Sequence, residues 1–148
     1  MLATSHSLTS ALIVSKILPP QLSLPLVLLS HYLLDIVPHW DTGTGLTSGR
    51  KSKKTAVLET LVDLAIAFTL VFIFFQKGKP FSPLLWVAVF LGILPDLIEF
   101  PALFFNIRPF PLNLLEKFHN DIMHRSGKLP WGLIYQLIFI GIIFRLFY

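Results

Sequence analysis

Long apolar stretches with few charged residues alternate with short polar segments along this chain of 148 residues. A helix that crosses a bilayer needs about 20 mostly apolar residues, and residues 55–76, 81–106 and 129–147 meet that requirement. Pro95 should kink or end the second of these helices, because proline removes a helical hydrogen bond. Pro130 opens the third helix, where a proline is tolerated. The sequence therefore predicts three membrane-spanning helices.

Three further segments are less apolar or shorter. Residues 5–18 and 21–37 are each short for a full span and are separated by two prolines, which indicates a helical hairpin that is tilted or only partly inserted. Residues 111–125 are amphipathic and too polar to cross, so we expect this segment at the membrane interface or folded back into the bundle. Residues 41–54 are rich in glycine, serine and threonine and form the one predicted loop.

Composition supports a membrane protein. Apolar residues make up 54% of the chain, and the mean hydropathy is +0.72, which exceeds the usual balance of a water-soluble domain. We therefore predict an all-α, integral membrane helical bundle. It has about five transmembrane or partly inserted helices and one short interfacial helix, in a single domain covering residues 1–148, with the 41–54 loop between the second and third helices.

Basic residues predict an orientation. Eight of the twelve lysines and arginines fall in two regions that five spanning segments place on the same side. These residues are Arg50, Lys51, Lys53, Lys54, Arg108, Lys117, Arg125 and Lys128. The positive-inside rule makes that side cytoplasmic, which predicts an inner (cytoplasmic) membrane protein. The net charge of +4 is explained by anionic lipid headgroups rather than by nucleic acid, because the basic residues lie beside apolar runs.

The acidic and histidine residues repeat at helical spacing. His31, Asp35 and His39 are separated by four residues each, which would align them on one face of a helix. Three further pairs have a spacing of three or four residues: Glu59 with Asp63, Asp96 with Glu99, and Asp121 with His124. On the predicted topology, these segments bring their polar residues to one membrane depth. A shared polar site at that depth is the main prediction from the sequence.

A metal ion would explain such a site. Ionisable groups within a membrane cost several kcal/mol unless they meet partners, and several carboxylates without a cation would repel one another. The chain has no cysteine, so a metal must be held by nitrogen and oxygen atoms. Carboxylates combined with neutral imidazoles suit Zn²⁺ best here, with Mn, Fe or Ni as alternatives.

Four short motifs carry a resemblance to a known family. They are TSH, ending at His6; HYLLDIVPHWD, residues 31–41; ILPDLIEF, with Asp96; and IMHRSGKLPW, with His124 and Arg125. Together they resemble the membrane-bound metal-dependent hydrolases of the YdjM-like family. The His-x-x-x-Asp spacing of His31 and Asp35 is also loosely similar to that of zinc-dependent phospholipases C.

The resemblance and the spacing together predict the site residues. The metal ligands are expected to be His6, His31, Asp35, His39, Asp96 and His124. Asp63, Glu59 or Glu99 would act as general base or support a ligating imidazole, and Arg125 with the 50–54 basic run would hold a phosphate. A site at headgroup depth predicts an amphiphilic substrate, such as a phosphoester-containing lipid.

The polar cluster also fits two roles besides hydrolysis. The same residues would suit a transport or binding protein for metal ions or protons, or they would stabilise a non-catalytic membrane bundle. Glu59 and Asp63 could instead pair with the basic residues at 50–54. Asp41, at the start of the loop, is the weakest candidate for the site. The sequence leaves the oligomeric state unknown.

Overall fold

The computed structural model describes residues 1–17, 19–46, 48–119, 121, 125 and 127–147. Within these residues all regular elements are helical, which confirms the predicted all-α class. The elements are α1 (Ala3–Lys16), α2 (Pro20–Asp35), α3 (Lys53–Val71), the π-helical turn η1 (Phe72–Gln76), α4 (Pro83–Phe105), α5 (Leu112–Phe118) and α6 (Trp131–Phe147).

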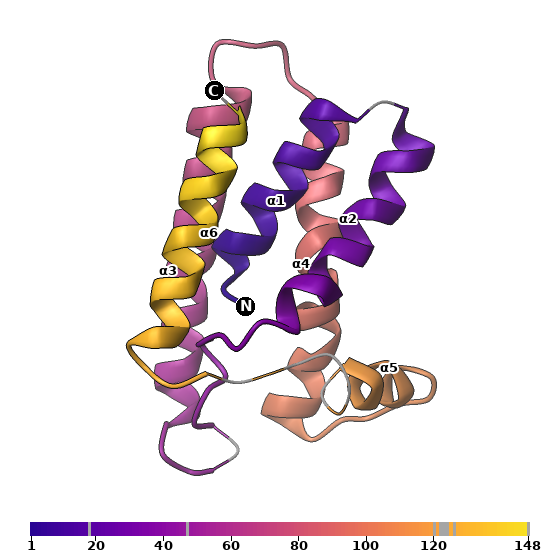
Figure 1. The fold of residues 1–148 in the computed structure, drawn as a ribbon. Coiled ribbons are helices and arrows are strands. Elements are labelled where there is room, and N and C mark those ends of the chain that lie inside the picture. Colours follow the sequence, from indigo (N-terminus) through magenta and orange to yellow (C-terminus); the bar gives the residue numbers. More distant parts are fainter. Residues whose placement is uncertain (18, 47, 120, 122–124, 126, 148) are drawn as a thin grey trace.

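Helix α1 lies inside the bundle, in contact with α2, α3, α4 and α6, whereas α5 lies across the lower end of the bundle (Figure 1). Most of α1 is buried, although its sequence is rich in serine and threonine. The hydrophobic core combines Leu8 and Ala11 of α1 with residues of the surrounding helices, among them Val27, Val71, Val89 and Ile143. A short, largely buried helix therefore sits at the centre of longer ones.

Small residues let α1 and α4 approach closely. A Cβ atom placed on Gly92 would lie 2.0 Å from Oγ and 3.2 Å from Cβ of Ser10, so any larger residue here would displace the Ser10 side chain. The Ser10 hydroxyl donates to the carbonyl of His6 at 2.7 Å, which satisfies it within α1. Close contact through small residues is typical of helix packing in membranes, and here it brings α4 against the turn that follows His6.

Among the described residues, two helices are long and apolar enough to cross a membrane: Lys53–Gln76, which combines α3 and η1, and α4. In the 18-residue apolar stretch of Lys53–Gln76, only 17% of the residues are buried within the protein, whereas 39% are buried in the corresponding stretch of α4. Large apolar side chains such as Leu61, Phe72 and Phe90 consequently point outward. Helix α6 is apolar but shorter.

The structure differs from the predicted elements at three points. Helix α4 does not end at Pro95 but continues to Phe105, and Asn106 closes it in the left-handed conformation with φ of 56°. Internal proline is tolerated in such helices where neighbouring groups satisfy the freed backbone atoms. Helix α5 has only seven residues of the predicted 111–125 segment. Helix α2 ends at Asp35, so His39 lies beyond it.

Candidate metal centre

Asp35, the last residue of α2, lies at the centre of the buried cluster, and its side chain is completely buried. Its Oδ2 atom is 2.7 Å from Nε2 of His119 and 3.4 Å from Nε2 of His31. Its Oδ1 atom is 3.3 Å from Nε2 of His6 and 3.6 Å from Nε2 of His39. The amino group of Met1 also contacts Oδ1. One carboxylate thus faces four imidazoles.

His31 is fixed by α4. Its Nδ1 is 2.7 Å from the carbonyl oxygen of Gly92. Because a carbonyl can only accept, Nδ1 carries the hydrogen and Nε2 keeps its lone pair. That Nε2 atom is buried without a hydrogen-bond partner, and it lies 3.6 Å from Oδ1 of Asp96. Metal-binding histidines usually have this arrangement, in which one ring nitrogen donates to a carbonyl and the other is left to bind the metal.

His39 is oriented in the same way although it lies beyond α2. Its Nδ1 is 2.8 Å from the carbonyl oxygen of Val37, which leaves the lone pair on Nε2, facing Asp35 and Asp41. The backbone holds this segment in place, since the His39 amide donates to the Arg125 carbonyl at 3.1 Å. The prediction that His31, Asp35 and His39 share one helical face was wrong, but the turn after α2 returns His39 to Asp35.

His6 comes from α1 and is also buried. Its ring stacks on that of His31, with centroids 4.0 Å apart and planes inclined by 22°. Neither of its ring nitrogens has a hydrogen-bond partner in the structure. Buried polar atoms are almost always paired, so the unpaired ring nitrogens of His6 and His31 are available to a ligand.

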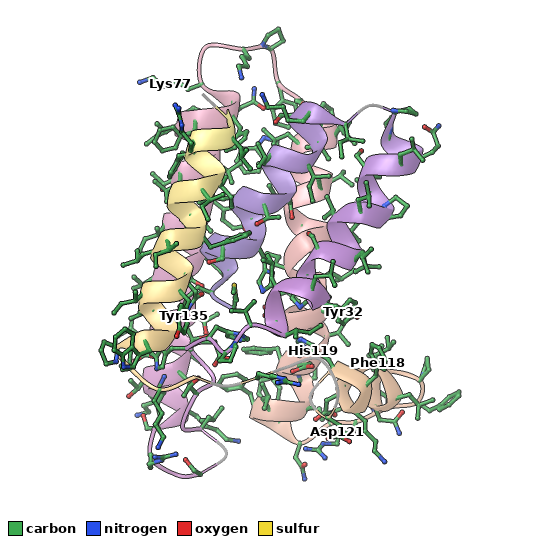
Figure 2. All side chains as sticks on the ribbon, in the orientation of Figure 1. Tyr32, Lys77, Phe118, His119, Asp121 and Tyr135 are labelled. Carbon is green, nitrogen blue, oxygen red and sulfur yellow. The ribbon has the colours of Figure 1, made fainter. Side chains whose placement is uncertain are left out.

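His119 follows α5 and is held between two carboxylates. Its Nδ1 is 2.5 Å from Oε1 of Glu99, and its Nε2 is 2.7 Å from Oδ2 of Asp35. Burial alone would lower the pKa of His119, but the hydrogen bonds to Asp35 and Glu99 raise it from its ordinary 6.5 to about 10. Figure 2 shows His119 beside Tyr32, at the end of the bundle opposite to Lys77.

Four of these residues form a compact donor set: His31, Asp35, Asp96 and His119 each offer one ligand atom, and the four atoms lie within 4.8 Å of one another. Two imidazoles and two carboxylates are a set that divalent transition metals bind well. Three of the four residues are buried, whereas the Asp96 side chain is 38% exposed. The set can therefore hold a metal ion with one side open.

The structure brings five of the six predicted metal ligands together: His6, His31, Asp35, His39 and Asp96. The sixth, His124, lies outside the described residues. His119 was not among the predicted ligands. In the sequence, only its place in the amphipathic 111–125 segment pointed to it. Its contact with Asp35 could not be predicted, because the contact depends on how that segment folds under the bundle.

Other predicted residues have different surroundings. Asp63 caps α1 from α3: its carboxylate accepts from the Ala3 amide at 2.6 Å and from the Thr4 hydroxyl at 2.6 Å. Glu59 pairs with Lys51, whose Nζ is 2.6 Å from Oε2, so the alternative pairing with the basic run is the one observed.

Arg125 lies next to the cluster through its backbone. Its amide donates to the carbonyl of Asp35 at 3.0 Å. The residue is exposed and does not belong to the lining of the neighbouring cavity. Its backbone therefore ties the segment after α5 to the end of α2, and this contact does not depend on the guanidinium group.

A cavity of about 220 Å³ lies beside the cluster, between α3, α4 and the start of the 41–54 loop. Its apolar lining includes Leu64, Leu97, Phe100, Leu103 and Phe104, and its acidic lining comprises Asp41, Asp63, Asp96 and Glu99. Asp96 thus joins the cavity to the donor set. The apolar walls of the cavity belong to α3 and α4, the two helices whose apolar side chains also point outward.

Comparison with known proteins yields no match: none was found among family models, curated proteins or solved structures.

Proposed function

We propose that this protein is a membrane-embedded, metal-dependent hydrolase that acts on an amphiphilic, lipid-like substrate. The observation that carries the proposal is the buried set of His31, Asp35, Asp96 and His119 beside a cavity with an apolar wall. The resemblance of the sequence motifs to the YdjM-like hydrolases favours the same function. The basic residues favour a site that faces the cytoplasm.

The donor set suits zinc in particular. Zn²⁺ is bound by imidazole nitrogens and carboxylate oxygens, and a catalytic zinc ion keeps a position for water beside its protein ligands. A bound ion would lower the pKa of that water toward neutrality. The protein's own residues supply orientation: Gly92 and Glu99 hold the outer ring nitrogens of His31 and His119. Asp96, which is partly exposed and lines the cavity, faces the substrate side.

The cavity favours a substrate with an apolar chain and a polar head. Leu97, Phe100 and Phe104 would contact the chain, and α3 and α4 would open this wall toward lipid. Lys53 provides a cation near the Phe104 end of the cavity, because its Nζ donates to the carbonyl of Phe104 at 2.6 Å. A phosphate group would be attracted to that ammonium and to the metal, so a lipid phosphoester is the preferred substrate.

The test begins with protein purified in mild detergent. Elemental analysis should find bound divalent metal, and a chelator should abolish hydrolysis of a panel of phospholipid and polyprenyl phosphate substrates in mixed micelles. Added Zn²⁺ should restore it. Asp96→Asn should lose metal and activity, whereas Asp121→Asn, the same change at an exposed position, should keep both. Folded wild-type protein that binds no divalent metal would contradict the proposal.

A further inference from the structure

The two oxygens of Asp35 face different sets of donors. Oδ2 is closest to His119 and His31, at 2.7 and 3.4 Å from their Nε2 atoms, and both residues belong to the compact set described above. Oδ1 faces His6 and His39, at 3.3 and 3.6 Å, and neither belongs to that set. A carboxylate has two acceptor oxygens, so Asp35 is placed to bind two cations at once.

A fourth donor, Asp41, lies beside His39. The Oδ2 atom of Asp41 lies 3.5 Å from Nε2 of His39, and its side chain is only 14% exposed. The second set, defined as His6, His39, Asp41 and Oδ1 of Asp35, again has two imidazoles and two carboxylates. This composition suits the same class of divalent ion as the first set.

His6 gives independent support for a ligand at this position. The residue is 1% exposed, and Nε2 faces Asp35 at 3.3 Å yet has no hydrogen-bond partner. The amino group of Met1 contacts the same Oδ1 atom, so this oxygen already accepts a positive charge in the structure. A second metal ion would satisfy the imidazole and would replace that ammonium group.

We propose that the site holds two divalent metal ions bridged by Asp35, the first bound by His31, Asp96 and His119 and the second by His6, His39 and Asp41. The inference rests on the proposed function. Two ions about 3.5–4 Å apart are the arrangement that phosphatases and nucleases use to stabilise the attacking and leaving oxygens of a phosphoester. Such a pair of ions would contact both of these oxygens in the phosphoester substrate proposed above.

Asp41 and Thr42 lie on the wall of the cavity, as does Asp96. The cavity is thus lined by one proposed ligand of each ion, Asp96 and Asp41. A phosphate in the cavity would have access to both positions at once, which a site open only toward Asp96 would not offer.

The experiment uses the full chain in detergent, stripped with a chelator and then loaded with Mn²⁺. Elemental analysis should find two ions per chain, and electron paramagnetic resonance should show a spin-coupled pair. Asp41→Asn and His39→Ala should each reduce the content to one ion and replace the coupled signal with that of isolated Mn²⁺. Asp41 lies in a loop, so its variant keeps the test valid if the His39 variant does not fold. Asp121→Asn is the matched control and should retain two coupled ions.

The outcomes separate the two proposals. One ion in the wild-type protein would overturn the second position and leave a single-metal hydrolase intact. Two ions without spin coupling would overturn the bridging role of Asp35. No bound ion at all would overturn both the two-ion site and the proposed function.

Discussion

Glu99 and His119 are joined by a hydrogen bond of 2.5 Å between Oε1 and Nδ1, although 20 residues separate them in the chain. The contact connects α4 to the segment after α5 and turns Nε2 of His119 toward Asp35. A carboxylate that binds the outer nitrogen of an imidazole fixes its orientation and raises its basicity as a ligand. Glu99 is therefore a positioning residue for the metal centre.

Replacing Glu99 with glutamine should weaken metal binding. The amide keeps the shape of the side chain but removes the negative charge, so zinc affinity should fall about 10–100-fold. Competition with a chromophoric chelator measures this change, and circular dichroism checks the helical content. Glu116→Gln is the control, because Glu116 of α5 pairs with Arg108 at 3.4 Å and is not one of the proposed metal ligands. Equal losses of affinity in both variants would contradict the role of Glu99.

Metal affinity should rise with pH because of His119. With the metal removed, this imidazole is protonated up to a pKa of about 10, since both of its nitrogens face carboxylates despite its burial. A ligand must lose its proton to bind metal. The logarithm of zinc affinity should therefore increase by about one per pH unit below that pKa, with one proton released per chain. Calorimetry in buffers of different ionisation enthalpy measures the release, and pH-independent affinity would contradict the assignment.

The same pKa determines how the stability of the stripped protein depends on pH. The folded pKa of His119 lies above its ordinary 6.5, so its contribution is complete below pH 6.5 and disappears as the pH rises toward about 10. Thermal unfolding of chelated protein in detergent should show this loss, and His119→Gln should remove it. A stability that instead increases across this interval would contradict the sign.

Helical spacing and proline positions predicted most elements because they act locally. The prolines at 19 and 20 separate α1 from α2, and Pro83 and Ser82 begin α4, where the Ser82 hydroxyl accepts from the Leu85 amide at 3.3 Å. The four-residue spacing of His31 and Asp35 also holds, since both lie on α2. These features depend on residues a few positions apart.

The positions of His39 and His119 depended on long-range contacts. His39 reaches Asp35 through a turn that is held by the backbone of Arg125, almost 90 residues later, and His119 depends on the path of the chain after α5. The role of Asp63 was also hidden, because a carboxylate on α3 can only be recognised as the cap of α1 once the two helices are packed together. Residue spacing carries no information about such contacts.

Gln136 of α6 connects two segments that carry ligands. Its Oε1 accepts from the Leu2 amide at 2.8 Å, near His6, and its Nε2 donates to the carbonyl of Trp40 at 2.7 Å, next to His39. Gln136→Leu leaves both backbone groups unpaired, which should cost about 1–3 kcal/mol of stability. Metal affinity should fall as well, because both segments lose their anchor. Unfolding in detergent and chelator competition measure the two effects.

Gln76 offers a matched control at the other end of the bundle. It is also buried, donates to the carbonyl of Pro80 at 2.8 Å and accepts from the Ser82 amide at 3.1 Å. Gln76→Leu should lower stability to a similar degree without changing metal affinity. If the two variants lose affinity equally, the loss in Gln136→Leu follows from stability alone and the anchoring role is wrong.

Gly132 at the start of α6 allows the His39 segment to pack against that helix. A Cβ atom there would lie 2.5 Å from the amide nitrogen of Trp40 and 3.0 Å from the carbonyl carbon of His39. Backbone atoms cannot move aside independently, so Gly132→Ala should displace His39 from Asp35. Since His39 belongs to the second donor set, the variant should lose one of two bound ions while the first remains.

The same substitution at Gly141 tests whether the effect is local. Both glycines lie in α6, but a Cβ atom on Gly141 would have no neighbour within 4 Å. Gly141→Ala should keep the full metal content and gain up to about 1 kcal/mol, because alanine favours a helix more than glycine. Elemental analysis after metal loading compares the two variants. A Gly132→Ala protein that retains as much metal as Gly141→Ala would show that His39 binds no ion, since the close approach of His39 and Trp40 to Gly132 cannot survive the added atom.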